Sequence, residues 1–112
     1  MISTAPDMAK FFRALLTGQI VQRRLLALMR SPISPNATTT GGIGRGYGLG
    51  LARYPLRCGS TWGHDGTVPG YRTLVRASPN GRRVAVLAFS NSLLSGPLAL
   101  IRSASIADLW CK

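Results

Sequence analysis

The stretch from residue 71 to residue 89, YRTLVRASPNGRRVAVLAF, holds two runs of strand-forming residues on either side of a turn. Its centre is Asn80-Gly81, a dipeptide that strongly signals a β-hairpin because both residues tolerate a positive φ. The run 83–89 places apolar side chains at consecutive positions, so both of its faces are apolar. We therefore expect strands at 71–77 and 83–89, with the second strand central in a sheet and covered on each side.

Two weaker strand candidates precede this hairpin. Residues 47–54 read YGLGLARY, and residues 61–64 read TWGH. Glycines within a strand allow another backbone to come close. Together with the hairpin, these runs predict an antiparallel sheet of about four strands within residues 47–90.

Helices are expected on both sides of the strand region. Thr4 can cap a helix and Pro6 suits its first turn. Apolar residues then recur at helical spacing, at Met8, Phe11, Phe12, Leu15 and Leu16. Residues 21–30 predict a second helix, residues 95–110 a last one, and the Pro-, Ser-, Thr- and Gly-rich residues 31–46 a loop. Residues 1–112 are thus expected to form one α+β unit with helices packed on the sheet.

The charge of the chain raises the question of a nucleic-acid partner. The formal charge is +11, from 14 Lys and Arg against three Asp and Glu. The cations stand singly or in pairs, and the glycines of residues 31–46 match no phosphate-binding motif, so we expect no nucleic acid and no cofactor. No apolar run reaches the roughly 18 residues of a membrane span, and the first residues do not form a signal peptide.

The chain has two cysteines, Cys58 and Cys111, and a single histidine. Their spacing does not match that of zinc ligands, so no metal site is expected. The residues alone leave two possibilities open, a disulfide and a pair of separate thiols.

The histidine lies within residues 62–71, WGHDGTVPGY, beside one of the three acidic residues. The helical STAPDMAKFFRALLTG and the strand YGLGL precede this segment, and the hairpin SPNGRRVAVLAFSN follows it. In this order the segments resemble the C-terminal part of the penicillin-binding serine β-lactamase and D-alanyl-D-alanine carboxypeptidase family, whose class C β-lactamase-like branch and secreted carboxypeptidase and esterase branches are the most similar. The resemblance covers nearly the whole chain, is weakest at residues 31–46, and implies a partial β-lactamase-like (transpeptidase-like) fold.

This resemblance identifies His64-Asp65-Gly66 with the family's third catalytic element, which lines the substrate cleft on an edge strand. It implies catalytic roles for these three residues and substrate-binding roles for their neighbours Gly63 and Thr67. The basic residue of the element supports proton transfer, and its glycine leaves bare backbone for the substrate. The implied reaction passes through a serine acyl-enzyme, with an ester, amide or peptide as the substrate.

Asp65 departs from the family pattern, which carries a hydroxyl residue at this position. An anion there would repel a substrate carboxylate, which favours a neutral ester or amide as the substrate. The structural alternative is that Asp65 only pairs with His64 or Arg72 at a strand edge.

Two further catalytic elements of the family, Ser-x-x-Lys and Tyr-x-Asn, do not occur in the sequence. The lysines are Lys10 and Lys112, and neither follows a serine by three residues. In the family both elements precede the helix that starts at Thr4, so the chain resembles the last third of a hydrolase, begun at an internal Met. By itself it is expected to be inactive. The alternatives are a small basic nucleic-acid-binding module and a non-catalytic interaction module.

The resemblance also implies a pairing and a location. The secreted carboxypeptidase branch has a Cys-Gly before its third element and another Cys at the end of its last helix. This predicts a disulfide between Cys58 and Cys111 and an extracellular or cell-envelope location for the parent protein. Apolar surface on residues 83–89 and on the helix face of residues 4–16 further predicts that the isolated chain self-associates.

Overall fold

The computed structural model describes residues 2–33, 46–90, 106 and 108–112. Most of the predicted loop at 31–46 and most of the predicted helix at 95–110 lie outside these residues. The described part holds two helices and one antiparallel sheet in the order β1-β2-β3-β4, which confirms the predicted α+β class. The elements are α1 (Ala5–Leu16), α2 (Arg23–Arg30), β1 (Ala52–Leu56), β2 (Gly59–Val68), β3 (Tyr71–Ala77) and β4 (Val84–Phe89).

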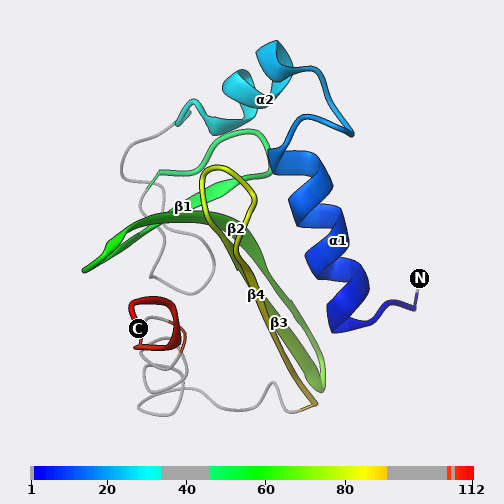
Figure 1. The fold of residues 1–112 in the computed structure, drawn as a ribbon. Coiled ribbons are helices and arrows are strands. Elements are labelled where there is room, and N and C mark those ends of the chain that lie inside the picture. The colour runs from blue at the N-terminus through cyan, green and yellow to red at the C-terminus, as the bar shows by residue number, and fades with distance from the viewer. Residues whose placement is uncertain (1, 34–45, 91–105, 107) are drawn as a thin grey trace.

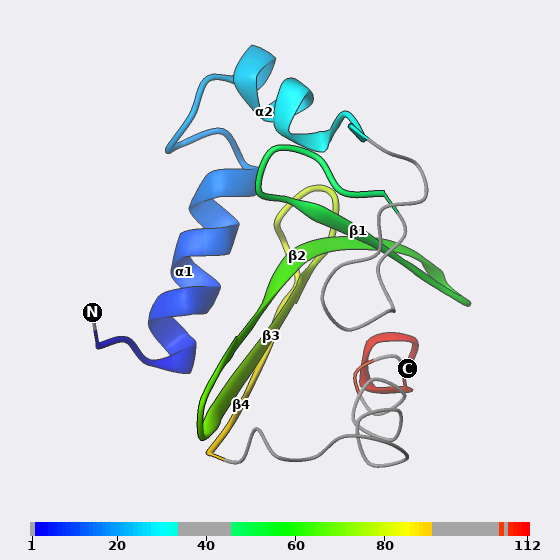
Figure 2. The ribbon, with the colours of Figure 1, turned by 180° about the vertical axis from the view of Figure 1, so that it is seen from behind.

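The sheet separates α1 from residues 108–112, which we call the C-terminal turn. Figure 1 shows α1 on one side of the sheet and the C-terminal turn on the other, and the view from behind in Figure 2 shows the same arrangement.

Neither helix in the described part of the chain is long and apolar enough to cross a membrane.

Helix α1 begins where the sequence predicts a cap. The Thr4 hydroxyl oxygen accepts a hydrogen bond from the Asp7 backbone N–H (3.3 Å), and the same hydroxyl donates to the Asp7 carboxylate (2.7 Å). The hydrogen bond from the Thr4 side chain lowers the pKa of Asp7, which also faces the positive end of the helix. The helix buries Phe12, Leu15 and Leu16, each at most 6% exposed, against the sheet.

Helix α2 adds Leu26 to the same core, and Arg30 connects it to two other elements. The Arg30 guanidinium lies 5.6 Å from the ring centroid of Trp62 on β2. Its Nη2 donates to the carbonyl of Pro79 in the β3–β4 turn at 2.7 Å. Burial lowers the pKa of Arg30, although a guanidinium keeps its charge at any physiological pH.

The predicted hairpin forms at its predicted turn. Asn80-Gly81 connects β3 to β4, and Gly81 has a φ of +70°, which an L side chain rarely adopts. The Ser78 N–H donates to the carbonyl of Arg83 at 2.9 Å, and the Gly81 N–H donates to the carbonyl of Ser78 at 2.8 Å. The turn lies against the end of α1, where the Gly81 backbone comes close to Thr17.

Three predicted strand features differ from the structure. The segment 47–54 turns before it becomes β1, because Gly50 has a φ of +75° and the Gly48 N–H donates to the carbonyl of Leu51 at 2.8 Å. The short strand predicted at 61–64 is the ten-residue β2. Strand β4 was expected at the centre of the sheet, but in the described part it pairs only with β3.

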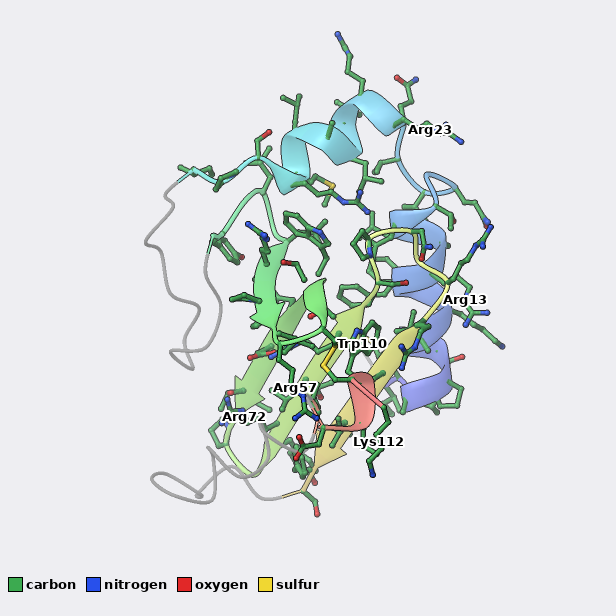
Figure 3. All side chains as sticks on the ribbon, turned by 60° about the vertical axis from the view of Figure 1, so that its left-hand side comes forward. Arg13, Arg23, Arg57, Arg72, Trp110 and Lys112 are labelled. Carbon is green, nitrogen blue, oxygen red and sulfur yellow. A yellow bond between two sulfur atoms is a disulfide. The ribbon has the colours of Figure 1, made fainter. Side chains whose placement is uncertain are left out.

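The C-terminal turn is fixed to the sheet by a disulfide, which confirms the predicted pairing. Cys58 and Cys111 are bonded, with a Cα–Cα distance of 5.5 Å, inside the range that a disulfide requires. Arg83 adds a hydrogen bond from Nη2 to the carbonyl of Trp110 at 2.9 Å, and its guanidinium stacks on the indole. Figure 3 shows Trp110 in the C-terminal turn, beside the strands of the sheet.

We expect the double variant Cys58→Ser/Cys111→Ser to lose about 4 kcal/mol of unfolding free energy. The crosslink joins residues 53 positions apart, and a loop of this length strongly restricts the unfolded chain. Urea denaturation followed by circular dichroism measures the loss. The unmodified chain in reductant is the matched control and should unfold like the variant. Equal midpoints for the variant and the oxidised chain would contradict the prediction.

Candidate functional site

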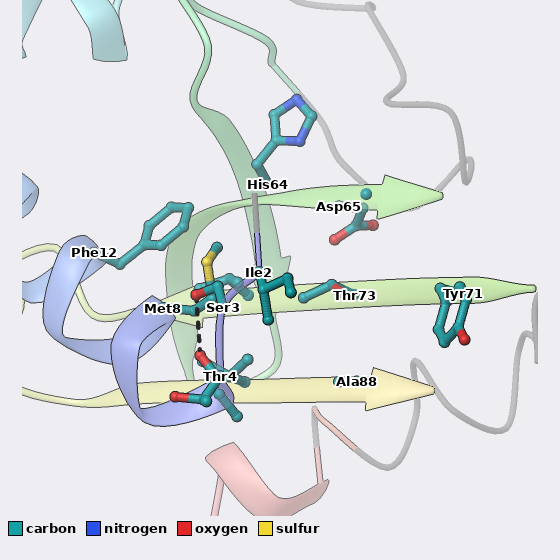
Figure 4. A pocket seen from close by; sticks show the side chains of 14 residues that line it. Ile2, Ser3, Thr4, Met8, Phe12, His64, Asp65, Tyr71, Thr73 and Ala88 are labelled. Carbon is teal, nitrogen blue, oxygen red and sulfur yellow. Dashed lines mark hydrogen bonds between the residues drawn. The ribbon is translucent and has the colours of Figure 1, made fainter. Parts of the chain in front are cut away.

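A pocket of about 710 Å³ lies between the N-terminal segment and one face of the sheet. The first turns of α1 form one wall, and residues of β2, β3 and β4 form the other (Figure 4). Most of the lining is apolar. The residues that line it are Ile2, Ser3, Thr4, Ala5, Met8, Phe12, His64, Asp65, Gly66, Tyr71, Thr73, Val75, Val86 and Ala88.

Strand alternation decides which residues of the predicted element face this pocket. His64 pairs with Val75 and Gly66 pairs with Thr73 across β2 and β3, and paired residues share a face of an antiparallel sheet. Val75 belongs to the core beneath α1, so His64 and Gly66 lie on the α1 side. Asp65 lies between them on the strand, so its side chain points to the opposite face, although the residue itself also borders the pocket.

Asp65 forms a buried ion pair on that opposite face. Arg76 Nη1 donates to Asp65 Oδ1 at 2.6 Å and Nη2 donates to Oδ2 at 3.3 Å. The two side chains are 4% and 8% exposed, and the guanidinium lies 3.3 Å from the ring centroid of Tyr54. The partners considered for Asp65 from the sequence, His64 and Arg72, were wrong. Register is the reason, because Arg76 lies opposite Gly63 and thus diagonally across from Asp65 on the same face.

The glycines of the predicted element differ in what surrounds them. A Cβ on Gly63 would lie only 1.9 Å from the Val75 carbonyl oxygen, so the packing of β2 on β3 itself requires glycine there. Among the described residues, a Cβ on Gly66 would meet nothing within 4 Å. The fold therefore gives no packing reason for Gly66, whereas Gly63 is explained by packing alone. Neither Gly63 nor Thr67 lines the pocket.

The segment from His64 to Val68 is an edge within the described sheet. Strand β1 pairs with β2 from Gly59 to Gly63 and ends there, while β3 continues to pair as far as Val68. Beyond Gly63 the second edge of β2 is thus not covered by a described strand. Alternate residues of such an edge present their N–H and C=O groups outward, where an extended ligand can pair with them.

Tyr47 contacts the site, although sequence reasoning assigned it no functional role. Its hydroxyl oxygen lies 3.0 Å from His64 Nε2, and the two rings meet edge to face at 5.7 Å between centroids. Tyr47 is not part of a Tyr-x-Asn element, because Leu49 follows it by two residues. No local sequence signal connects two side chains 17 residues apart, so only the fold could reveal the contact.

The described residues thus form an antiparallel sheet covered by helices. An edge segment of this sheet carries His64 beside a mostly apolar cleft. The sequence model of the β-lactamase family matches residues 1–109. The chain therefore belongs to the β-lactamase family of serine hydrolases, as its motifs predicted.

Solved structures with the same fold include an amidohydrolase and an amidase. A D-stereospecific amidohydrolase from Streptomyces is similar with a TM-score of 0.73 and 27% identity, over 90% of this chain and 29% of that one. The D-amino acid amidase from Ochrobactrum anthropi SV3, complexed with L-phenylalanine amide, gives a TM-score of 0.78 at 24% identity, over 97% of this chain and 32% of that one. The chain thus spans about a third of the length of these relatives.

We expect Asp65→Asn to destabilise the fold by about 3–5 kcal/mol, because it leaves the buried Arg76 cation without its counter-charge. The double variant Asp65→Asn/Arg76→Gln should recover most of this loss, since it removes both charges. Thermal and urea unfolding of the two variants and the parent chain measure the coupling. If the single variant is as stable as the parent chain, the pair does not hold β2 on β3.

Proposed function

We propose that this chain forms one wall of the substrate cleft of an acyl-transferring serine hydrolase. In this proposal His64 supports proton transfer, and the edge backbone at Gly66 binds the acyl part of the substrate. Asp65 has a structural role as the ion-pair partner of Arg76, and its side chain does not place a charge in the cleft. The serine and its base come from a part of the enzyme outside residues 1–112, which correspond to the C-terminal part of the family's domain.

The lining of the pocket supports a neutral, apolar substrate. Met8, Phe12, Val75 and Val86 offer apolar surface, and the described residues that line the pocket include no lysine or arginine. A free carboxylate would therefore lose its hydration without gaining a counter-charge. From the sequence, a neutral substrate was expected because Asp65 would repel a substrate carboxylate. In the structure, Arg76 neutralises the Asp65 carboxylate. The lining provides a different physical reason for the same substrate class.

The open position of Gly66 is the observation that carries the proposal. It lies on the pocket face of an edge segment, and no residue that the structure describes occupies the space where its side chain would be. Glycine weakens a strand, so its presence here is explained if a ligand lies against the bare backbone. An amide of an apolar amino acid fits this geometry, because its carbonyl and N–H can pair with the strand edge.

Binding of phenylalanine amide to the 112-residue chain tests the proposal, at a pH about two units above the ordinary α-amino pKa, where the ligand carries no charge. We expect a dissociation constant in the millimolar range, as about 0.3 kcal/mol per heavy atom predicts for a ligand of this size. Free phenylalanine should bind more weakly, because the lining offers its carboxylate no cation. The shifts of the single histidine in NMR spectra report binding. Equal affinities for the amide and the free acid would contradict the neutral-substrate assignment.

Gly66→Ala provides the matched variant for this experiment. It should bind the amide at least about tenfold more weakly, a change of about 1.4 kcal/mol, because the new methyl group takes the ligand's place. Its stability should equal or exceed that of the parent chain, since an unstrained Gly→Ala change restricts the unfolded state. A variant that binds the amide unchanged would remove Gly66 from the site.

Covalent labelling tests the expected source of the nucleophile. Without a Ser-x-x-Lys element, no serine of this chain should form an adduct with a fluorophosphonate or a penicillin, and nitrophenyl esters should hydrolyse at the background rate. Catalysis that remains without a nucleophile is small compared with that of a complete site. Intact-mass spectrometry gives the measurement. A stoichiometric adduct would show that the chain supplies its own nucleophile.

The basic alternative receives less support, because several arginines already have partners within the protein. Arg30 and Arg83 donate to carbonyl oxygens, and Arg76 pairs with Asp65. Figure 3 shows Arg13, Arg23, Arg57 and Arg72 spread over different elements. We therefore propose that the partner of this site is a small acyl substrate and not a nucleic acid.

Location and association are further parts of the proposal. The Cys58–Cys111 disulfide favours an extracellular or cell-envelope location, where oxidised cysteines persist. The apolar face of α1, expected to drive self-association, is buried against the sheet within the chain itself. Phe11 of α1 is nevertheless 48% exposed, and further exposed apolar side chains lie on α2, where Leu25 and Leu28 are 42% and 52% exposed. Self-association of the isolated chain is proposed to involve this helix.

A further inference from the structure

We propose that Tyr47 is a positioning residue that holds neutral His64 in its Nδ1–H tautomer and fixes the direction of the imidazole at the pocket. This inference rests on the proposed function of His64 and names the group that prepares it. Tyr47 is not part of a Tyr-x-Asn element, and it contributes through the histidine.

The contact involves one defined nitrogen of the ring. The Tyr47 hydroxyl oxygen lies 3.0 Å from Nε2, which is hydrogen-bonding distance. A neutral imidazole has one N–H donor and one bare nitrogen acceptor. The hydrogen bond made by one nitrogen determines which of the two carries the proton.

The chemistry of the phenol favours one of the two possible directions. A phenol hydroxyl is an acidic donor, and its oxygen is a weak acceptor because a lone pair is delocalised into the ring. The imidazole nitrogen without a proton is a strong acceptor. Tyr47 therefore donates and Nε2 accepts, and the ring proton resides on Nδ1. Nε2 is occupied by this bond, so Nδ1–H is the group that His64 can offer to a ligand in the pocket.

Three contacts fix the backbone at Tyr47 and Gly48, and thereby the position of the phenol. Tyr47 forms a bridge with Ala52 at the start of β1, and its carbonyl accepts from the Ile33 N–H at 3.0 Å. The next residue, Gly48, lies so close to the Met29 carbonyl at the end of α2 that a Cβ would be 1.9 Å from its oxygen. A phenol on such a fixed backbone can orient a partner ring, since the contact costs little additional ordering.

The edge position of His64 makes such a partner useful. Beyond Gly63, β2 has a described neighbour on one side only, and His64 is exposed. An exposed imidazole on a strand edge turns freely unless a second group holds it. The hydroxyl and the edge-to-face ring contact of Tyr47 restrict this rotation.

The single histidine makes the test direct. In the 112-residue chain labelled with ¹⁵N, long-range ¹H–¹⁵N correlation spectra show only the two ring nitrogens of His64. The spectra are recorded about two pH units above the ordinary histidine pKa, where imidazoles are neutral. The expected pattern is a protonated Nδ1 and an unprotonated Nε2. A chain that shows mainly Nε2–H overturns the proposal, and this measurement needs no variant.

Tyr47→Phe removes the hydroxyl and keeps the ring. The variant should shift the tautomer population toward Nε2–H, with the amide spectrum of the sheet unchanged. Tyr71→Phe is the matched control, because it removes the hydroxyl of another tyrosine at the same pocket and should leave both ring nitrogens unchanged. A Tyr47→Phe variant that folds and keeps the parent tautomer also overturns the proposal, since the hydroxyl would then have only a packing role.

Adding phenylalanine amide separates this inference from the proposed function. With both correct, the ligand shifts the Nδ1 resonance while Nε2 keeps its tyrosine-bound position. A ligand that shifts neither nitrogen contradicts the proposed function, and the tautomer measured without the ligand still supports the role of Tyr47. A ligand that shifts Nε2 and leaves Nδ1 unchanged overturns the assignment of Nδ1–H as the group presented to the pocket.

Discussion

The buried ion pair between Asp65 and Arg76 fixes how β2 lies on β3, and the arrangement of the pocket depends on this register. A slip of one residue would move every side chain of β2 to the other face of the sheet. It would turn His64 away from α1 and place the Asp65 carboxylate on the α1 side, at the mostly apolar pocket. The pair opposes this slip because Arg76 has its counter-charge and its stacking partner Tyr54 only in the observed register.

The two faces of the sheet consequently have separate tasks. One face carries the ion pair and lies toward the C-terminal turn, which the Cys58–Cys111 disulfide ties to the start of β2. The other face packs against α1 and ends in the apolar pocket with His64 at its edge. The side chains of the ion pair thus lie on the side opposite the cleft, and most of the cleft lining is apolar. This separation agrees with a site that binds a neutral acyl group.

Local signals predicted the elements whose causes are local. The cap at Thr4, the apolar face of α1 and the Asn80-Gly81 turn each depend on residues a few positions apart, and all three form as expected. The expected boundaries of β1 and the expected central position of β4 were wrong within the described sheet, because they depend on turns and neighbours rather than on strand propensity. Residues 47–51 look like a strand by composition, but the positive φ of Gly50 makes them a turn.

By itself the sequence determined the family, the α+β class and the segment that carries His64, because motifs and short-range periodicity are written in consecutive residues. The tertiary structure alone decided what His64 and Asp65 contact, although they are neighbours in the chain. Strand alternation points them to opposite faces, where Tyr47 reaches the first from 17 residues away and Arg76 pairs with the second from 11 residues away. Partners at such separations depend on strand register and backbone path, and local sequence patterns contain neither.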